Sequence, residues 1–166
     1  QDNSITVKEA LVAQIAKIGE NLNIRRFEKV AADNGCVVSY IHGGGRIGVL
    51  VVADTDVVND DIKACLKNVA MQVAAMNPIA VDEAGVPADV LEKEKEIAAD
   101  KARQEGKPEN MIEKIAMGRI SKFYKEVCLL KQEYIQDGKM TVAEYLKSVD
   151  KDLTVTAFKR FTLRAE

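Results

Sequence analysis

The sequence predicts an α+β fold: a small antiparallel sheet of three to four strands, helices packed on one face, and a protruding antiparallel helical hairpin. Two stretches rich in β-branched residues, "CVVSYIH" and "RIGVLVVAD", flank three glycines, a pattern typical of a β-hairpin. Residues 60–76 carry apolar side chains at helical spacing. Residues 88–130 are densely charged, with only a narrow apolar stripe. Such a stripe suits two helices that pack mainly on each other.

Capping residues mark where several helices should begin and end. Thr6 with Glu9 and Thr141 with Glu144 form the reciprocal pattern of a capping box, in which each side chain accepts from the other residue's backbone. Gly19 supplies a left-handed stop for the first helix. Asn59 precedes "DDIKACLKNVAMQVAAM" and is expected to cap that helix. The apolar stripe of the first helix (Val7, Leu11, Ile15 and Ile18) requires a packing partner.

The expected sheet begins and ends with less regular strands. "RRFEKVAA" (25–32) is interpreted as the first and weakest strand, followed by the turn signal Asp33-Asn34-Gly35. "TVTAFKRFTLRA" is interpreted as the last strand. A strand so late in the chain must pair with the earlier ones, since it would otherwise leave an exposed edge.

The charged segment 88–130 is predicted to form an arm of two helices separated by Gly106-Lys107-Pro108. Asp89 with Glu92 is expected to cap the first helix, and Pro108 fits the first turn of the second. Because so few apolar residues are available, the outer faces of the arm should be wet. We therefore expect it to stand out from the body.

Composition excludes several classes of protein. The 166 residues carry a net charge of −2, which provides no field for gripping nucleic acid or an anionic membrane. No apolar run approaches the roughly 20 residues of a membrane span. Three cysteines without a CxxC pair and a single histidine argue against a disulfide framework and against a metal site. Reduced thiols in a cytoplasmic protein are expected.

The loop Gly43–Arg46 admits two interpretations. Phosphate cradles place their glycines directly before a helix, whose amides and dipole hold the anion. Here a strand follows, and no Lys-Ser or Lys-Thr pair is present, so a hairpin tip is favoured. His42 beside the loop is either a solvated side chain with no role or a contact to another protein. No local nucleophile pairs with it for catalysis.

A second candidate contact lies in "LKQEYIQDGK", where Tyr134-Ile135 is apolar in polar surroundings. The pair could pack against the body or serve as an exposed anchor for a partner. The residue pattern leaves both alternatives open.

Five collinear stretches resemble the bacterial translation elongation factor Ts family: "AKIGENLNIRR", "SYIHGGGRIGVLV", "VAMQVAAMNP", "EGKPENMIEKIAMGRISKFYKEVCLL" and "TVAEYL". The resemblance implies a protein that binds elongation factor Tu and promotes GDP release, with no catalytic residues, no cofactor and no metal. On that reading the Gly43–Arg46 loop contacts a protein, and the phosphates belong to the partner.

The resemblance also implies a domain organisation. Residues 1–24 would be the last helix of the preceding half of a two-part core. Residues 25–166 would be the C-terminal subdomain of the dimerisation domain, with 88–130 as its coiled-coil arm. Two family hallmarks, the N-terminal three-helix module and a Thr-Asp-Phe-Val segment, have no counterpart in the sequence. We therefore expect the chain to be a piece of a longer protein.

Five residues are expected to face elongation factor Tu by this resemblance: Ile18, Gly19, His42, Ile135 and Gln136. Gln136 is polar where family members can carry an apolar residue. Two other functions stay open on the residues alone. One is a small enzyme that binds an anion or nucleotide at Gly43–Arg46, and the other is a structural module that forms a homodimer through a sheet edge or the arm.

Overall fold

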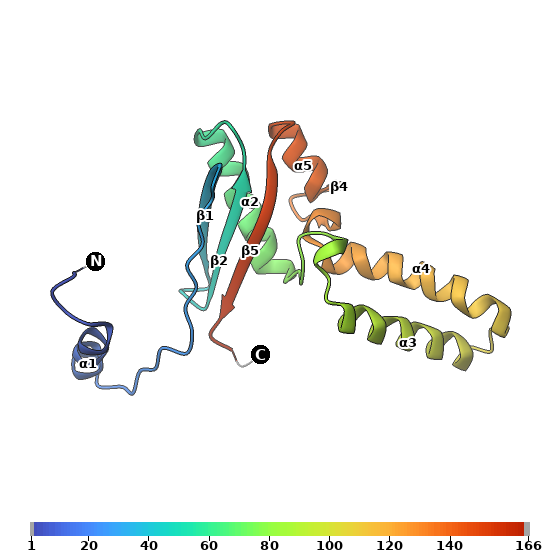
Figure 1. The fold of residues 1–166 in the computed structure, drawn as a ribbon, viewed down its shortest axis with the longest axis horizontal. Coiled ribbons are helices and arrows are strands. Elements are labelled where there is room, and N and C mark those ends of the chain that lie inside the picture. The colour runs from blue at the N-terminus through green and yellow to red at the C-terminus, as the bar shows by residue number, and fades with distance from the viewer. Residues whose placement is uncertain (1, 165–166) are drawn as a thin grey trace.

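The computed structural model describes residues 2–164 as a small sheet-and-helix body with a helical arm and a separate N-terminal helix (Figure 1). The helices are α1 (Val7–Ile18), α2 (Asp60–Met76), α3 (Ala88–Gln104), α4 (Glu109–Val127) and α5 (Val142–Val149). The strands are β1 (Gly35–His42), β2 (Ile47–Asp54), β3 (Glu133–Tyr134), β4 (Asp137–Thr141) and β5 (Thr154–Thr162). Short 3-10 turns at Glu83–Gly85 and Leu129–Lys131 complete the described elements.

The main sheet has three antiparallel strands in the order β1-β2-β5, which confirms the expected α+β class. β1 and β2 form a hairpin in which His42 lies opposite Ile47 and Gly35 opposite Asp54. The late strand β5 pairs with the other edge of β2, with a register shift between Val52 and Ala53. β3 and β4 form a separate two-stranded ladder.

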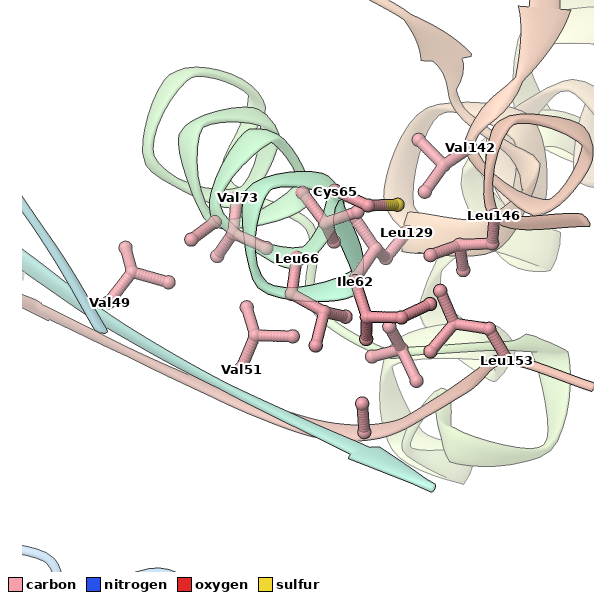
Figure 2. Close-up of a cluster of buried hydrophobic side chains, with 14 of the residues drawn as sticks. Val49, Val51, Ile62, Cys65, Leu66, Val73, Leu129, Val142, Leu146 and Leu153 are labelled. Atoms are coloured by element: carbon pink, nitrogen blue, oxygen red, sulfur yellow. The ribbon is translucent and has the colours of Figure 1, made fainter. Parts of the chain in front are cut away.

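The core lies between the sheet and α2, with α5 beside α2 (Figure 2). Alternation along β2 points Val49, Val51 and Ala53 toward α2, and all three are almost fully buried. The buried cluster also takes in Ile62, Cys65, Leu66, Val69, Ala70, Val73, Ala74, Leu129, Val142, Leu146, Leu153 and Val155. The sheet, α2 and α5 therefore form one packed unit.

Helix ends follow the expected chemistry in most places. The Thr6 and Thr141 side chains accept from the backbones of Glu9 and Glu144, and both capping boxes are complete. Asn59 accepts from the Ile62 amide at the start of α2. The expected cap of α3 by Asp89 is wrong: α3 begins at Ala88, one residue after Pro87, which makes no side-chain cap. Asp89 instead lies in the first turn of α3, where its negative charge interacts favourably with the helix dipole.

The expected first strand at 25–32 is also wrong. Residues 20–32 are assigned no secondary structure, although they run extended beside the sheet (Figure 1). Their side chains contact β5: Arg26 stacks 4.4 Å from the Phe161 ring centroid, and Glu28 lies 3.2 Å from the Lys159 Nζ. β5 is at the opposite edge from β1. A segment that reaches β5 through side chains crosses the outer face of the sheet and cannot extend the ladder at β1.

The arm is formed by α3 and α4, which pack on each other and project from the body as expected (Figure 1). Its contact is narrow and rich in alanine, with Ala98, Ala102, Ile112, Ala116 and Ile120 buried. Two larger apolar residues of the arm, Ile97 and Met111, are 46% and 47% exposed. Alanines from both helices share this contact with Ile112 and Ile120, so it holds small and large apolar side chains together.

Candidate functional site

His42 lies at the end of β1, where the sheet extends past the buried core. It shares its sheet face with Val38 and Tyr40, which pack on the core, because alternate residues of a strand face the same side. Unlike them, His42 is exposed. The Tyr40 hydroxyl and the His42 Nδ1 are 2.9 Å apart, and the two rings lie with centroids 5.8 Å apart. When Tyr40 donates to Nδ1, the imidazole proton is on Nε2, which is left free to donate to a partner.

The glycine loop beside His42 has a geometry that few other residues could adopt. Gly43, Gly44 and Gly45 have φ of 62°, 66° and 90°, all in the left-handed region. The Arg46 amide donates to the His42 carbonyl at 3.1 Å and closes the turn. The loop leads directly into β2 rather than into a helix. It therefore lacks the aligned amides and dipole of a phosphate cradle.

The second position is the two-residue turn Ile135-Gln136 between β3 and β4. Tyr134 just before it is 4% exposed and stacks on Tyr145, with ring centroids 4.1 Å apart. Burial raises the pKa of Tyr134 well above its usual range, so this ring stays neutral. Ile135, by contrast, is 47% exposed. The open question about this pair is thus answered residue by residue: Tyr134 packs down, and Ile135 projects.

Side chains from α2 hold the turn in place. The Ile135 amide donates to Gln72 Oε1 at 3.0 Å. Gln136 Nε2 reaches Asn68 Oδ1 at 3.4 Å, and Asn68 Nδ2 donates to the Tyr145 hydroxyl at 2.9 Å. The turn therefore presents its exposed side chains from a hydrogen-bonded base. The sequence pattern did not predict the roles of Gln72 or Tyr40, because their partners are set by the tertiary fold or by side-chain geometry.

The third position is the C-terminal end of α1. Gly19 adopts φ 77° and its amide donates to the Ile15 carbonyl, which confirms the predicted left-handed stop. Ile18 is 53% exposed, and α1 has no buried residue. No hydrogen bond or ion pair among residues 2–164 joins α1, the His42 loop and the Ile135-Gln136 turn. The assignment of these residues to a partner surface stays a prediction.

Two specific features are absent from the described residues: a metal-binding cluster and a membrane-spanning helix. Within residues 2–164, no three His, Cys, Asp or Glu side chains are grouped so that they could hold a metal ion. The same residues include no helix with the length and apolarity needed to cross a membrane. A groove of about 850 Å³ lies along the arm, and its lining includes Arg103 and Glu109, which form an ion pair. Its lining includes no histidine or cysteine.

Comparison with known proteins identifies the relatives of this chain. Residues 1–165 match the family model described as Elongation factor TS. Elongation factor Ts from Clostridium botulinum (strain ATCC 19397 / Type A) is 48% identical over 164 residues, covering 96% of this chain and 53% of that protein. Elongation factor Ts from Clostridium novyi (strain NT) is also 48% identical, with 96% and 54% covered. The chain spans about half the length of these relatives. It belongs to the elongation factor Ts family.

Proposed function

We propose that this chain is the part of an elongation factor Ts that holds elongation factor Tu, and that the full-length factor promotes GDP release from that partner. The observation that supports the proposal most is the family match over residues 1–165 with 48% identity to named elongation factors Ts. The chain acts on a binding equilibrium and performs no covalent chemistry. We also propose the domain assignment that the resemblance implies, with residues 1–24 belonging to the preceding half of the core and 25–166 forming the C-terminal subdomain.

The proposed contacts are the α1 end at Ile18 and Gly19, the loop at His42, and the turn at Ile135 and Gln136. All five residues are exposed, so none must leave the core to meet a partner. The last two places rest on a rigid base: His42 on a paired strand and Ile135 on the buried Gln72 side chain. A surface that is already ordered loses little conformational entropy on docking, which favours affinity.

Nucleotide exchange follows from such binding by linkage. A partner that binds the nucleotide-free form of Tu more tightly than the GDP-bound form lowers the affinity of Tu for GDP by the same factor. The proposed role of this chain is to supply the grip. The element that disturbs the phosphate and magnesium site would be the Thr-Asp-Phe-Val segment of the family, which is absent from residues 1–166. We therefore expect this chain to bind Tu and to accelerate GDP release far less than a full-length elongation factor Ts.

The contacts are tested by the affinity of single variants for Tu. His42→Ala and Ile135→Ala should each weaken binding about tenfold, in the range of an interface residue worth roughly 1–2 kcal/mol. Both residues are exposed, so the melting temperature should change little. Phe27→Ala is the matched control, since this side chain is 86% exposed and lies outside the proposed contacts. Equal affinity of all three variants and the unmodified chain would refute the contact assignment.

A further inference from the structure

Two glutamine side chains are buried in the body of the molecule, where a primary amide is costly unless it is fully hydrogen-bonded. Gln72 on α2 has no exposed surface, and Gln132, just after the turn that follows α4, is 2% exposed. They are 60 residues apart in sequence, and Gln72 Nε2 lies 3.2 Å from Gln132 Oε1. Neither residue belongs to the contact set described above. Their hydrogen bonds indicate what they do.

Gln72 binds the backbone on both sides of Tyr134. Its Nε2 donates to the Glu133 carbonyl at 3.0 Å, and its Oε1 accepts from the Ile135 amide at 3.0 Å. One side chain thus occupies a donor and an acceptor of the β3–β4 turn. A neighbouring β-strand would hydrogen-bond to the edge of a strand in the same pattern. Here the side chain of a helix residue makes those hydrogen bonds.

Gln132 connects the same point to the base of the arm. Its Nε2 donates to the Glu126 carbonyl in the last turn of α4 at 2.8 Å. Its own carbonyl accepts from the Val142 amide at the start of α5 at 3.0 Å. The two side-chain amides therefore join α2, the end of α4 and the turn, and the Gln132 backbone adds the start of α5.

The β3–β4 turn has few other supports. Its ladder includes only two residue pairs, Glu133 with Thr141 and Tyr134 with Asp137, and the register shifts between them. A two-stranded hairpin of this size is marginal on its own in water. The Tyr134 ring on Tyr145 fixes the buried side of the turn but makes no hydrogen bond to the Ile135 backbone. On the exposed side, Gln136 makes a 3.4 Å side-chain contact with Asn68, and the Ile135 backbone amide is held by Gln72.

We propose that Gln72 is a positioning residue for partner binding: its amide holds Ile135 and Gln136 in the conformation that docks, and Gln132 orients that amide. This inference rests on the proposed function, because docking is the process in which the turn would act. The alternative is that Gln72 contributes to stability alone. The two accounts differ in whether loss of the amide affects binding beyond its effect on folding.

The test compares Gln72→Met with Val73→Ala in the full chain. Methionine keeps the length of the side chain and removes its hydrogen bonds, whereas Val73 is the next residue of α2, fully buried against the sheet. Both variants should lower the melting temperature by roughly 5 °C. Only Gln72→Met should weaken Tu binding, by about tenfold, and speed hydrogen exchange at the Ile135 amide by at least tenfold. Gln72→Asn, which retains an amide but is one methylene shorter, replaces Gln72→Met if that variant does not fold.

A double-substitution cycle measures whether Gln72 acts through the turn. In the Gln72→Met chain, Ile135→Ala should cause much less further loss of affinity than it does in the unmodified chain. His42→Ala should cost the same in both backgrounds. Additive effects of Gln72→Met and Ile135→Ala, or equal affinities of Gln72→Met and Val73→Ala, would overturn the positioning role.

The same measurements separate this inference from the proposed function. If the unmodified chain does not bind Tu, the proposed function is wrong and the docking role of Gln72 is wrong with it. If the unmodified chain binds and Gln72→Met binds equally well, only the inference about Gln72 is wrong. Gln72→Met could also speed hydrogen exchange at the Ile135 amide and leave the affinity for Tu unchanged. That outcome gives the second result, because Gln72 would order the turn while binding to Tu would not depend on that order.

Discussion

The three cysteines differ in their surroundings, and their reactivity should differ accordingly. Cys65 and Cys128 are buried, and burial raises the pKa of both thiols. A raised pKa means less of the reactive thiolate at any given pH. Cys36 on β1 is only half-buried. The reactivity of the native protein should therefore come from Cys36.

We expect a thiol-specific disulfide reagent at pH 8 to modify one cysteine rapidly in the native chain and the other two only after unfolding. Cys36→Ser should abolish the fast phase and leave two slow thiols. The measurement is the number of thiols that react in the fast phase and in the slow phase, followed by the absorbance of the chromophore that the reagent releases. Two or three fast thiols in the native chain would contradict the burial of Cys65 and Cys128.

Local chemistry was predictable at most single residues where the partner is close in sequence, and Asp89 is the exception. Thr6, Asn59, Gly19 and Thr141 were expected from the sequence and adopt their expected caps, because each partner lies within four residues. The Gln72–Gln132 bond joins residues far apart in the chain, and the sequence "VAMQVAA" contains only a polar residue in an apolar run. Its partner is fixed by how α2 packs, which no local pattern encodes.

At the scale of elements, the start of α2 offers a direct test of how a cap contributes to stability. The Asn59 side chain accepts from the Ile62 amide at 2.9 Å. Asn59→Ala removes this acceptor and should lower the free energy of unfolding by about 1 kcal/mol. Chemical denaturation should show a lower midpoint with an unchanged slope. Asn59→Asp keeps an acceptor and serves as the control. If Asn59→Ala has the same denaturation midpoint as the unmodified chain, the Asn59 cap does not contribute to stability.

Elements were predictable where one pattern dominates, and were missed where side chains compete with the backbone. β1, β2 and α2 have the expected apolar periodicity and form as expected. Residues 25–32 do not form the expected strand, because Arg26 and Glu28 make their contacts with β5 across the face of the sheet. The strand propensity of a segment does not determine which surface its charged side chains will contact. In the arm, likewise, helical spacing did not show that Ile97 is 46% exposed while Ile112 and Ile120 are buried.

At the scale of the whole molecule, α1 contributes little to the fold that the body adopts. None of its residues is buried, and Val7 and Val12 are 72% and 56% exposed. Deletion of residues 1–19 should leave the melting temperature of the body within about 1 °C, since little packed surface is lost. Deletion of residues 1–34 also removes Arg26 and Glu28 from β5 and should lower it further. A fall of many degrees on the first deletion would show that α1 packs on the body in solution.

The sequence and the family resemblance together were sufficient for the fold class and the arm, and they named the surface residues that are proposed to meet a partner. The relation among those surfaces could not be predicted. α1 is joined to β1 by residues 19–34, and the His42 loop and the Ile135-Gln136 turn lie on separate elements of the body. The three surfaces would form a single binding site only for a partner that contacts all of them.

The most direct test of the account is to map Tu binding on the isotopically labelled chain by the amide signals that shift or broaden as Tu is added. We expect the affected signals to cluster at residues 18–19, 42–46 and 135–136, while addition of GDP alone changes none of them. Shifts at 43–46 with GDP alone would indicate a nucleotide site. The absence of any change with Tu would contradict the claim that this chain works by holding that protein.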